Sequence, residues 1–275
     1  MTDLRAAHDA AEGAQRRYEA RQPAASAISA CLAAQRQAPK RSAWAKLFGF
    51  GPLTEQSRKW YSNAIGEEHI ADELAKLGPE WVILHAVPVG ERGQAVNHLA
   101  IGPAGVFTID AVHQHGSMIE VRRDARSSQL YVNGAERPYI AQARNVATDA
   151  AVSLTRAVGM NVPVRGLLVA VAPKSLSVRD EPDDVGVASE RSVRGWLAGA
   201  GRELSAAQIR TIADVAAQAS TWRGATFQSR LPSFDPEVFE TLRIQVQRAW
   251  FARVVWAGAL IAAAAITAVQ MASAT

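Results

Sequence analysis

The sequence predicts a mixed α/β domain flanked by helices, with a helical leader before it and a membrane-spanning helix after it. Three observations predict this class. The first 36 residues are rich in alanine with interleaved charges, which is a helical composition. Between residues 60 and 222, β-branched runs alternate with helical apolar stripes and Gly/Pro turns. The last 22 residues carry no charge.

We therefore expect four segments. They are a basic, alanine-rich helical leader (1–59), a globular domain (60–222), a linker with a juxtamembrane helix (223–249) and a transmembrane helix (250–272).

Composition and charge narrow the classes of function. A hydrophobic content of 48% with 20% charged residues describes a folded protein, and the net charge of +4 is uneven. Ten basic and five acidic residues stand in the first 60 positions, against twenty and twenty-one in the remainder. A basic leader favours an anionic surface, either lipid or nucleic acid, or else a solvated arm. The single Cys31 excludes an internal disulfide and fits a reducing compartment.

The leader contains one apolar stretch of its own. Pro23 interrupts the predicted helix over residues 3–36, and Ser42–Pro52 follows it. This stretch places Trp44, Leu47 and Phe48 near basic residues (Lys40, Arg41 and Lys46). The aromatic and basic mixture suits a membrane surface. Packing against the domain that follows is the alternative.

The globular domain opens with a helix and a strand. Gly66-Glu67 is expected to begin the helix, whose buried stripe contains Ile70, Ala71, Leu74 and Leu77, and Gly78-Pro79 to end it. Trp81–Val87 is then a strand, followed by a loop at Gly90–Gly93.

A β-hairpin follows, and it is the centre of the domain. The runs Val96–Ile101 and Gly105–Asp110 flank the turn Gly102-Pro103-Ala104. Asn97 stands at the start of the first strand and Asp110 at the end of the second, so the hairpin brings these two polar side chains together.

The second half of the domain alternates strands and helices. We expect a hairpin of Ser117–Arg122 and Gln129–Val132, a helix from Arg137-Pro138 to about Val158, a fully covered strand Val164–Val171, a short helix Ser189–Leu197, a helix from the Ser205-x-x-Gln208 capping box to about Ala219, and a last helix begun by Asp235-Pro236.

The end of the chain predicts a membrane anchor. After Arg253 the uncharged run has 22 residues, and about 20 helical residues span a hydrocarbon core of roughly 30 Å. Trp250, Phe251 and Trp256 would form an interfacial belt, and Arg243 and Arg248 also precede the span. Because positive flanks stay inside, we expect a single-pass protein of the cell membrane with its N-terminal domain in the cytoplasm. A buried helix is the alternative.

The order helix, strand, hairpin, helix and strand resembles the restriction-endonuclease-like fold, and the residues resemble most closely its nuclease-related branch, the NERD domain. The likeness covers roughly residues 60 to 200. It rests on Gly66-Glu67 with Ile70, Ala71 and Leu74, Asn97-His98, Ile101-Gly102-Pro103, Gly105-Val106-Phe107, Ile109-Asp110, Gly116, Tyr131-Val132-Asn133-Gly134 and the strand Val164–Val171.

The resemblance implies a metal-dependent phosphodiesterase site. In that family a helix glutamate and two hairpin acids hold a divalent ion, and a lysine two residues after the second acid handles the water. Carried across, Glu67 and Asp110 match two acids and would be the metal ligands, with Mg²⁺ or Mn²⁺ as the ion. Asn97 stands in place of the other acid and Val112 in place of the lysine. Arg122 or Arg123 would be the replacement cation.

The sequence therefore favours a membrane-anchored, catalytically eroded nuclease-like domain that binds nucleic acid or protein, with Glu67, Asn97 and Asp110 as a vestigial site. We expect no metal and no small-molecule cofactor. Two alternatives remain: an active divalent-metal nuclease with a rebuilt site, and a membrane-associated scaffold that uses the N-terminal helices. Separately, His98, His113 and His115 are candidates for a histidine metal site.

Overall fold

The computed structural model describes residues 21–36, 38–39, 41–89, 94–124, 127–222 and 234–273. The chain divides into two compact units. The first contains residues 63–229 together with residues up to 25, and the second contains residues 26–62 and 230–275. The predicted loop Gly90–Gly93, most of the linker after Trp222, and residues 1–20 of the leader lie outside the described residues.

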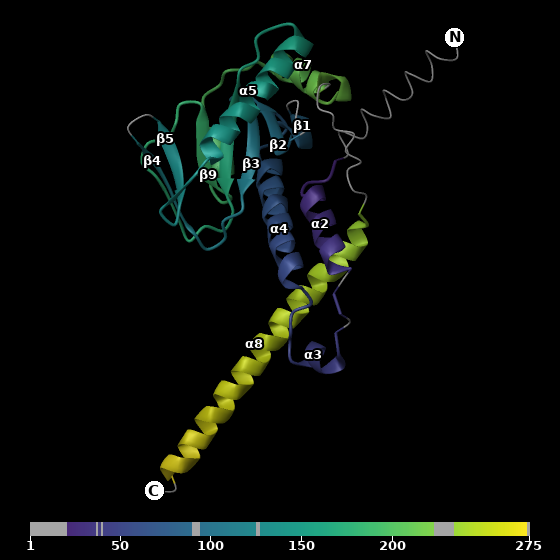
Figure 1. Cartoon of the computed structure of the whole chain (residues 1–275), viewed down its shortest axis with the longest axis vertical. Helices are drawn as coiled ribbons and strands as arrows, with labels where there is room; N and C mark the ends of the chain where they lie inside the picture. Colours follow the sequence, from purple (N-terminus) through teal and green to yellow (C-terminus); the bar gives the residue numbers. More distant parts are fainter. Residues whose placement is uncertain are drawn as a thin grey trace, which may run out of the picture. The chain divides into compact units, whose positions relative to one another are not determined.

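The first unit is built on a five-stranded mixed sheet with the strand order β1-β2-β3-β7-β9 (Figure 1). The first three strands form an antiparallel meander, and β7 and β9 continue it in parallel. The strands are β1 (Val82–Val89), β2 (Gln94–Gly102), β3 (Gly105–Val112), β7 (Val164–Ala170) and β9 (Val185–Ser189). This mixed sheet and its flanking helices confirm the predicted fold class.

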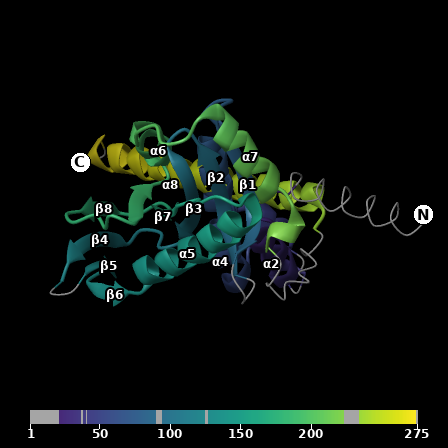
Figure 2. The ribbon, with the colours of Figure 1, turned by 90° about the horizontal axis from the view of Figure 1, so that it is seen from above.

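Helices cover both faces of this sheet (Figure 2). Ile70 and Leu74 from α4 (Glu55–Ala75) pack on one face with Phe107 and Ile109 of β3. Ala150 and Leu154 from α5 (Tyr139–Val158) pack on the other face, with α7 (Ala206–Ala216) beside them. The alternation of side chains along β3 sends Phe107 and Ile109 to one face and Val106 and Val112 to the other.

A second sheet of four strands, in the order β6-β5-β4-β8, lies beyond the N-terminal end of α5. Its core of Ile119, Val121, Leu130 and Val132 packs with Ile140 of α5. The strands are β4 (Met118–Arg123), β5 (Ser128–Val132), β6 (Ala135–Arg137) and β8 (Ser175–Val178). The sequence predicted the β4–β5 hairpin but not β6, β8 or β9, which are short strands without a clear periodic signal.

The first helix corrects a prediction. Helix α4 begins at Glu55, so Gly66-Glu67 lies in its interior instead of opening it. Glycine at this position has a packing reason, because a β-carbon on Gly66 would clash with Cγ1 of Val171. A glycine inside a helix is therefore tolerated here for the close approach of α4 to the end of β7. That approach also brings the neighbouring Glu67 to the sheet.

The predicted N-terminal caps of two later helices are present in the structure. Ser205 and Gln208 form the expected capping box of α7. The helix predicted at Ser189–Leu197 is displaced: α6 covers Val193–Gly199, and Ser189 instead ends β9. Asp235 accepts a hydrogen bond from the backbone N–H of Glu237 at 2.9 Å, which caps the last helix. A short 3-10 turn at Ala219–Trp222 closes the first unit and buries Trp222.

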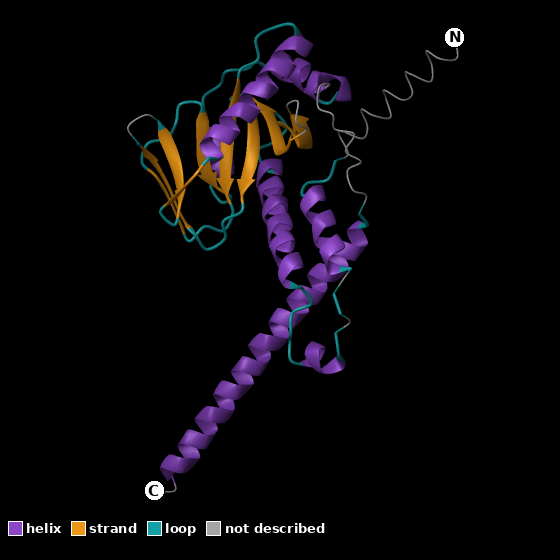
Figure 3. Cartoon of the chain, in the orientation of Figure 1, coloured by secondary structure: helices purple, strands orange, loops and turns teal. Residues whose placement is uncertain are grey.

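The second unit is helical (Figure 3). It contains α2 (Ala25–Gln35), α3 (Ala43–Leu47), the first turns of α4 and the 38-residue α8 (Pro236–Ser273). Residues 236–272 of α8 are long and apolar enough to cross a membrane, and the apolar part is not covered by the rest of the protein. An uncovered helix argues against the alternative of a buried core helix.

Candidate functional site

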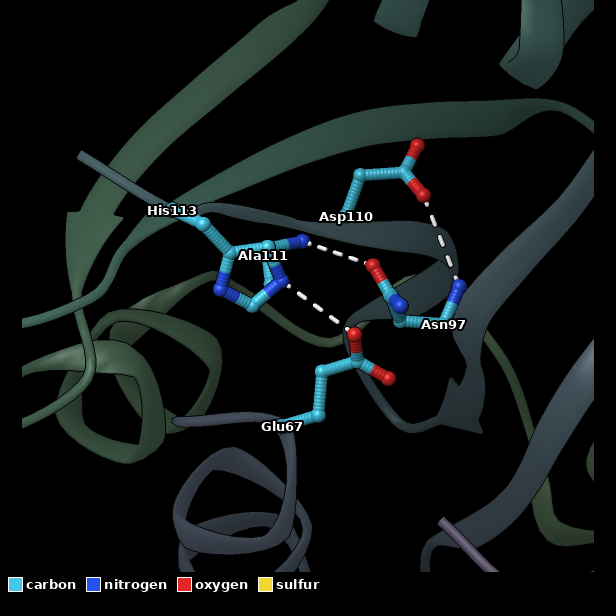
Figure 4. Close-up of polar contacts among 5 residues, drawn as sticks. All are labelled: Glu67, Asn97, Asp110, Ala111 and His113. Atoms are coloured by element: carbon cyan, nitrogen blue, oxygen red, sulfur yellow. Dashed lines mark hydrogen bonds and ion pairs between the residues drawn. The ribbon is translucent and has the colours of Figure 1, made fainter. Parts of the chain in front are cut away.

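Four polar side chains from four points of the sequence meet at the open end of the first hairpin (Figure 4). Glu67 comes from α4, Asn97 from β2 and Asp110 from β3, while His113 directly follows β3. Because Gly66 lets α4 approach the sheet, Glu67 is buried beside the strand ends. The tertiary structure thus brings Asn97 to Asp110 and Glu67 to His113, with the Glu67 carboxylate near enough to contribute to the raised pKa of Asp110.

Asn97 is used as a link between strands. Its Oδ1 accepts a hydrogen bond from the backbone N–H of Ala111 at 2.8 Å, where the β2–β3 ladder has already ended at His98 and Ile109. Its own backbone N–H donates to Oδ1 of Asp110 at 3.4 Å. The amide oxygen that would ligate an ion therefore satisfies a backbone donor of the neighbouring strand.

Asp110 is a carboxyl group whose charge is disfavoured. Its pKa is raised to about 6, chiefly by burial; the hydrogen bond from the Asn97 N–H lowers it in part, and the nearby Glu67 carboxylate adds a smaller upward contribution. Close to neutral pH a fraction of this group is thus protonated, and a protonated carboxylic acid is a weak ligand for a hard cation.

Glu67 has a protein partner of its own. Nε2 of His113 lies 3.2 Å from Oε1 of Glu67, and both side chains are largely covered. Figure 4 shows the His113 ring facing the Glu67 carboxylate. The sequence reasoning had not assigned a histidine to this position beside the glutamate.

Two further groups border the site. The ring of His115 stacks on His113 with centroids 6.3 Å apart, and burial lowers the pKa of His115. Glu190 is buried after β9, and its Oε2 accepts the backbone N–H of Ala172 at 3.1 Å. Ala172 has a left-handed backbone (φ 43°), so Glu190 holds a turn that few alanines adopt.

Arg122, one of the two predicted replacement cations, is engaged away from the site. The guanidinium of Arg122 lies over the ring of Tyr131, 4.0 Å from its centroid, and pairs with Glu120 on the second sheet. Val112, at the position of the family's lysine, is buried in the core beneath α5. Among the residues that the structure describes, no three His, Cys, Asp or Glu side chains are arranged to hold a metal ion.

A second histidine pair lies elsewhere in the sheet. Nδ1 of His98 on β2 is 2.8 Å from Nδ1 of His85 on β1, so one neutral ring donates to the other. His98 is fully buried, and this burial, with a smaller contribution from the neighbouring His85, lowers its pKa to about 3. His98 is therefore a neutral packing histidine in a different place from His113 and His115, so the three histidines predicted as one metal site are separated.

An acid on a helix near the ends of a hairpin that carries an amide and an acid is the arrangement expected from the resemblance to nuclease-related domains. Residues 62–171 match the family model of the nuclease-related domain, NERD, so the chain contains a NERD domain over that range. No curated protein and no solved structure matches the chain.

Sequence reasoning missed His113 as a partner of Glu67, because 46 positions separate the two and nothing local links them. It also missed Glu190. One sequence feature could have pointed to His113: two histidines, His113 and His115, stand directly after the strand that carries Asp110.

Proposed function

We propose that this chain is a membrane-anchored NERD protein whose nuclease-related domain serves as a binding module and does not hydrolyse phosphodiesters. The observation that carries the proposal is the closure of the candidate metal site. Asn97 bonds the backbone of β3, Glu67 faces His113, and burial disfavours the charge of Asp110.

The engagement of these side chains by protein groups matters because phosphodiester hydrolysis of this type requires a bound divalent ion. Mg²⁺ loses its water only to strong oxygen ligands in nearly octahedral order, and a nuclease uses it to polarise phosphate and activate water. Here one anionic ligand is replaced by an amide, and a second titrates near neutrality. Val112 offers no group to the water. These features support binding, of nucleic acid or of protein, over cleavage.

The anchor belongs to the same proposal. Helix α8 has the length and composition of a single span, and Arg243, Arg248 and Arg253 precede its uncharged part. By the positive-inside rule these arginines remain in the cytoplasm, together with the NERD domain, and the C-terminus crosses the cell membrane.

The test compares metal binding and cleavage by the full-length protein in detergent. Calorimetry with Mn²⁺ and nicking of plasmid DNA are measured for the wild type, Asn97→Asp and Asp110→Ala. We expect no nicking by the wild type and a gain of Mn²⁺ affinity in Asn97→Asp, which adds one anionic ligand without adding volume. Wild-type nicking that Asp110→Ala abolishes would refute the proposal.

One observation favours an active nuclease as a second candidate. His113 lies 3.2 Å from Glu67, where it could take the role of the missing lysine in handling a proton. In that case His113→Gln abolishes the Mn²⁺-dependent nicking of the wild-type domain. A wild type without nicking rejects this candidate.

The salt dependence of binding tests which kind of partner the module has. If the basic leader engages an anionic polymer or surface, binding of single-stranded RNA or duplex DNA weakens steeply as salt rises, because counterions are released. Binding that is insensitive to salt would instead favour the scaffold alternative, in which apolar contacts of the N-terminal helices hold a protein partner.

A further inference from the structure

The segment of residues 42–50, which we call the aromatic turn, exposes large apolar side chains. It consists of α3 and the residues Phe48–Phe50. Trp44 is 69% exposed, Phe50 66% and Leu47 52%, and α3 buries no residue at all. Such a concentration of exposed aromatic surface in nine residues is unfavourable in water.

The aromatic turn is nevertheless ordered by polar contacts. Ser42 caps α3 by accepting the N–H of Ala45 at 3.1 Å. The guanidinium of Arg41 donates to the carbonyls of Ala45 and Phe50, which closes the turn at both ends. The rings of Trp44 and Phe48 stack with centroids 5.8 Å apart. The exposure is therefore a property of a defined conformation.

The aromatic turn is docked on helix α8 of the same unit. Nε1 of Trp256 donates to the carbonyl of Leu47 at 2.8 Å, and the rings of Phe48 and Trp256 have centroids 5.1 Å apart. Gly49, with a left-handed φ of 74°, lies directly on the backbone of α8, since a β-carbon there would be 2.7 Å from the N atom of Arg253. Only glycine fits this approach.

The docking point coincides with the polarity boundary of α8. Arg253 is the last charged residue of the chain, and the contacts of the aromatic turn fall at Ala249, Arg253 and Trp256. If the uncharged part of α8 spans a bilayer, these residues lie at its cytoplasmic surface. Trp250 and Phe251, which are 60% and 64% exposed, lie at the same level of α8.

We propose that the aromatic turn is inserted into the cytoplasmic headgroup region of the bilayer that α8 spans, as a second membrane contact. The proposal rests on the anchoring role of α8. Trp44, Leu47 and Phe50 enter the boundary between headgroups and acyl chains, where aromatic side chains are most favourable. The exposed Lys46 is placed to meet anionic lipid phosphates.

The test places one spin label at a time on the full-length protein in nanodiscs of phosphatidylcholine and phosphatidylglycerol. The background variant is Cys31→Ser, in which the hydroxyl can replace the thiol as donor to the Ser57 carbonyl. Labels are attached at Leu47→Cys in the aromatic turn, at Ala263→Cys in the span and at Asn145→Cys, an exposed site on α5. Collision rates with oxygen and with a water-soluble nickel chelate report depth.

We expect the oxygen-to-nickel ratio at Leu47→Cys to be several-fold above that at Asn145→Cys and below that at Ala263→Cys. A water-like ratio at Leu47→Cys with a lipid-like ratio at Ala263→Cys overturns the inserted turn and leaves the anchor standing. Water-like ratios at both positions overturn the anchor and the turn together.

A second variant separates insertion from mere proximity to the membrane. Replacing Trp44 and Phe50 by serine in the Leu47→Cys background removes the two most exposed rings of the turn and keeps Gly49 and the Trp256 contact. We expect the ratio at Leu47→Cys to fall to that of Asn145→Cys, with unchanged circular dichroism. An unchanged ratio overturns the proposal that these rings insert.

Discussion

The two compact units differ in how far their large aromatic side chains are buried. In the first unit Phe107 is fully buried, and even polar groups such as His98 and Glu67 are covered by neighbours. In the second unit Trp44 and Phe50 are more than half exposed, and the apolar part of α8 is uncovered. A water-soluble surface rarely leaves such an apolar area open.

Under the proposed membrane anchor, the two units face two different solvents. The first unit satisfies its apolar groups by burial and its polar groups by internal hydrogen bonds, as a domain in water does. The second unit exposes apolar side chains, and the proposed anchor would place them against lipid in place of protein neighbours. We therefore expect changes in the first unit to alter stability and pH dependence, and changes in the second to alter where the protein is found in the cell.

The largest effect is expected from removing the span. A chain that ends at Arg248 lacks the uncharged run, so we expect it in the soluble fraction of a cell lysate while the full-length protein stays with the membranes. Fractionation followed by immunoblotting measures this. Recovery of the full-length chain in the soluble fraction without detergent would show that the second unit does not anchor the protein in a membrane.

The next largest effect is expected from His98, which should make the folded first unit less stable at acidic pH. Its folded pKa of about 3 lies below the ordinary value of 6.5, so the unfolded chain binds a proton that the folded domain does not. This contribution to stability is complete above pH 6.5 and is lost as the pH falls toward 3. At about pH 4.5 the loss relative to neutral pH is about 3 kcal/mol.

His98→Gln removes that proton and keeps a group able to hydrogen bond His85. We expect the free energy of unfolding of the variant to fall less between about pH 6.5 and 4.5 than that of the wild type. Tryptophan fluorescence during denaturant unfolding in detergent measures the difference. Parallel pH profiles would show that His98 is protonated in the folded domain.

Asp110 is expected to have the opposite effect on the pH dependence of stability, lowering the stability of the first unit as the pH rises. Its folded pKa of about 6 lies above the ordinary 3.8, so its contribution to stability is complete below about pH 3.8 and is lost as the pH rises through 6. Asp110→Asn stays neutral and keeps an acceptor for the Asn97 N–H. We expect the variant to be more stable than the wild type by about 3 kcal/mol at about pH 8, with little gain near pH 4.

Denaturant unfolding at the two pH values tests this prediction, and a gain of the same size at both would mean that the charge of Asp110 has no part in it. A variant that is less stable at pH 8 would show instead that the ionised Asp110 is needed, as an active metal site requires.

The smallest effect is expected from the close approach of α4. Gly66→Ala forces a methyl group against Val171, a stiff β-branched side chain, and should destabilise the first unit by about 2 kcal/mol. Gly195→Ala is the matched control, because no atom lies within 4 Å of a β-carbon there. The control should be neutral or slightly stabilising, since alanine is the better helix former. Equal thermal midpoints for the two variants would contradict the packing role of Gly66.

Local patterns in the sequence were enough to predict much of the molecule. The alternation and turn residues of the central hairpin, the capping box at Ser205 and the uncharged run after Arg253 each depend on neighbours a few positions away. They therefore predicted the mixed α/β class, the β2–β3 hairpin and a helix able to span a membrane. Asn97 and Asp110 met because two antiparallel strands joined by a short turn must bring their free ends together.

Tertiary structure decided the rest. The helix start at Gly66-Glu67 was wrong because a glycine normally marks a helix boundary, and only contact with Val171 explains one in the interior of α4. The pairing of Glu67 with His113 and the pKa of Asp110 depend on burial and on partners tens of residues away. The docking of the aromatic turn on Trp256 joins residues 209 positions apart. Such contacts leave no local periodicity in a sequence, since they arise only when separate elements pack.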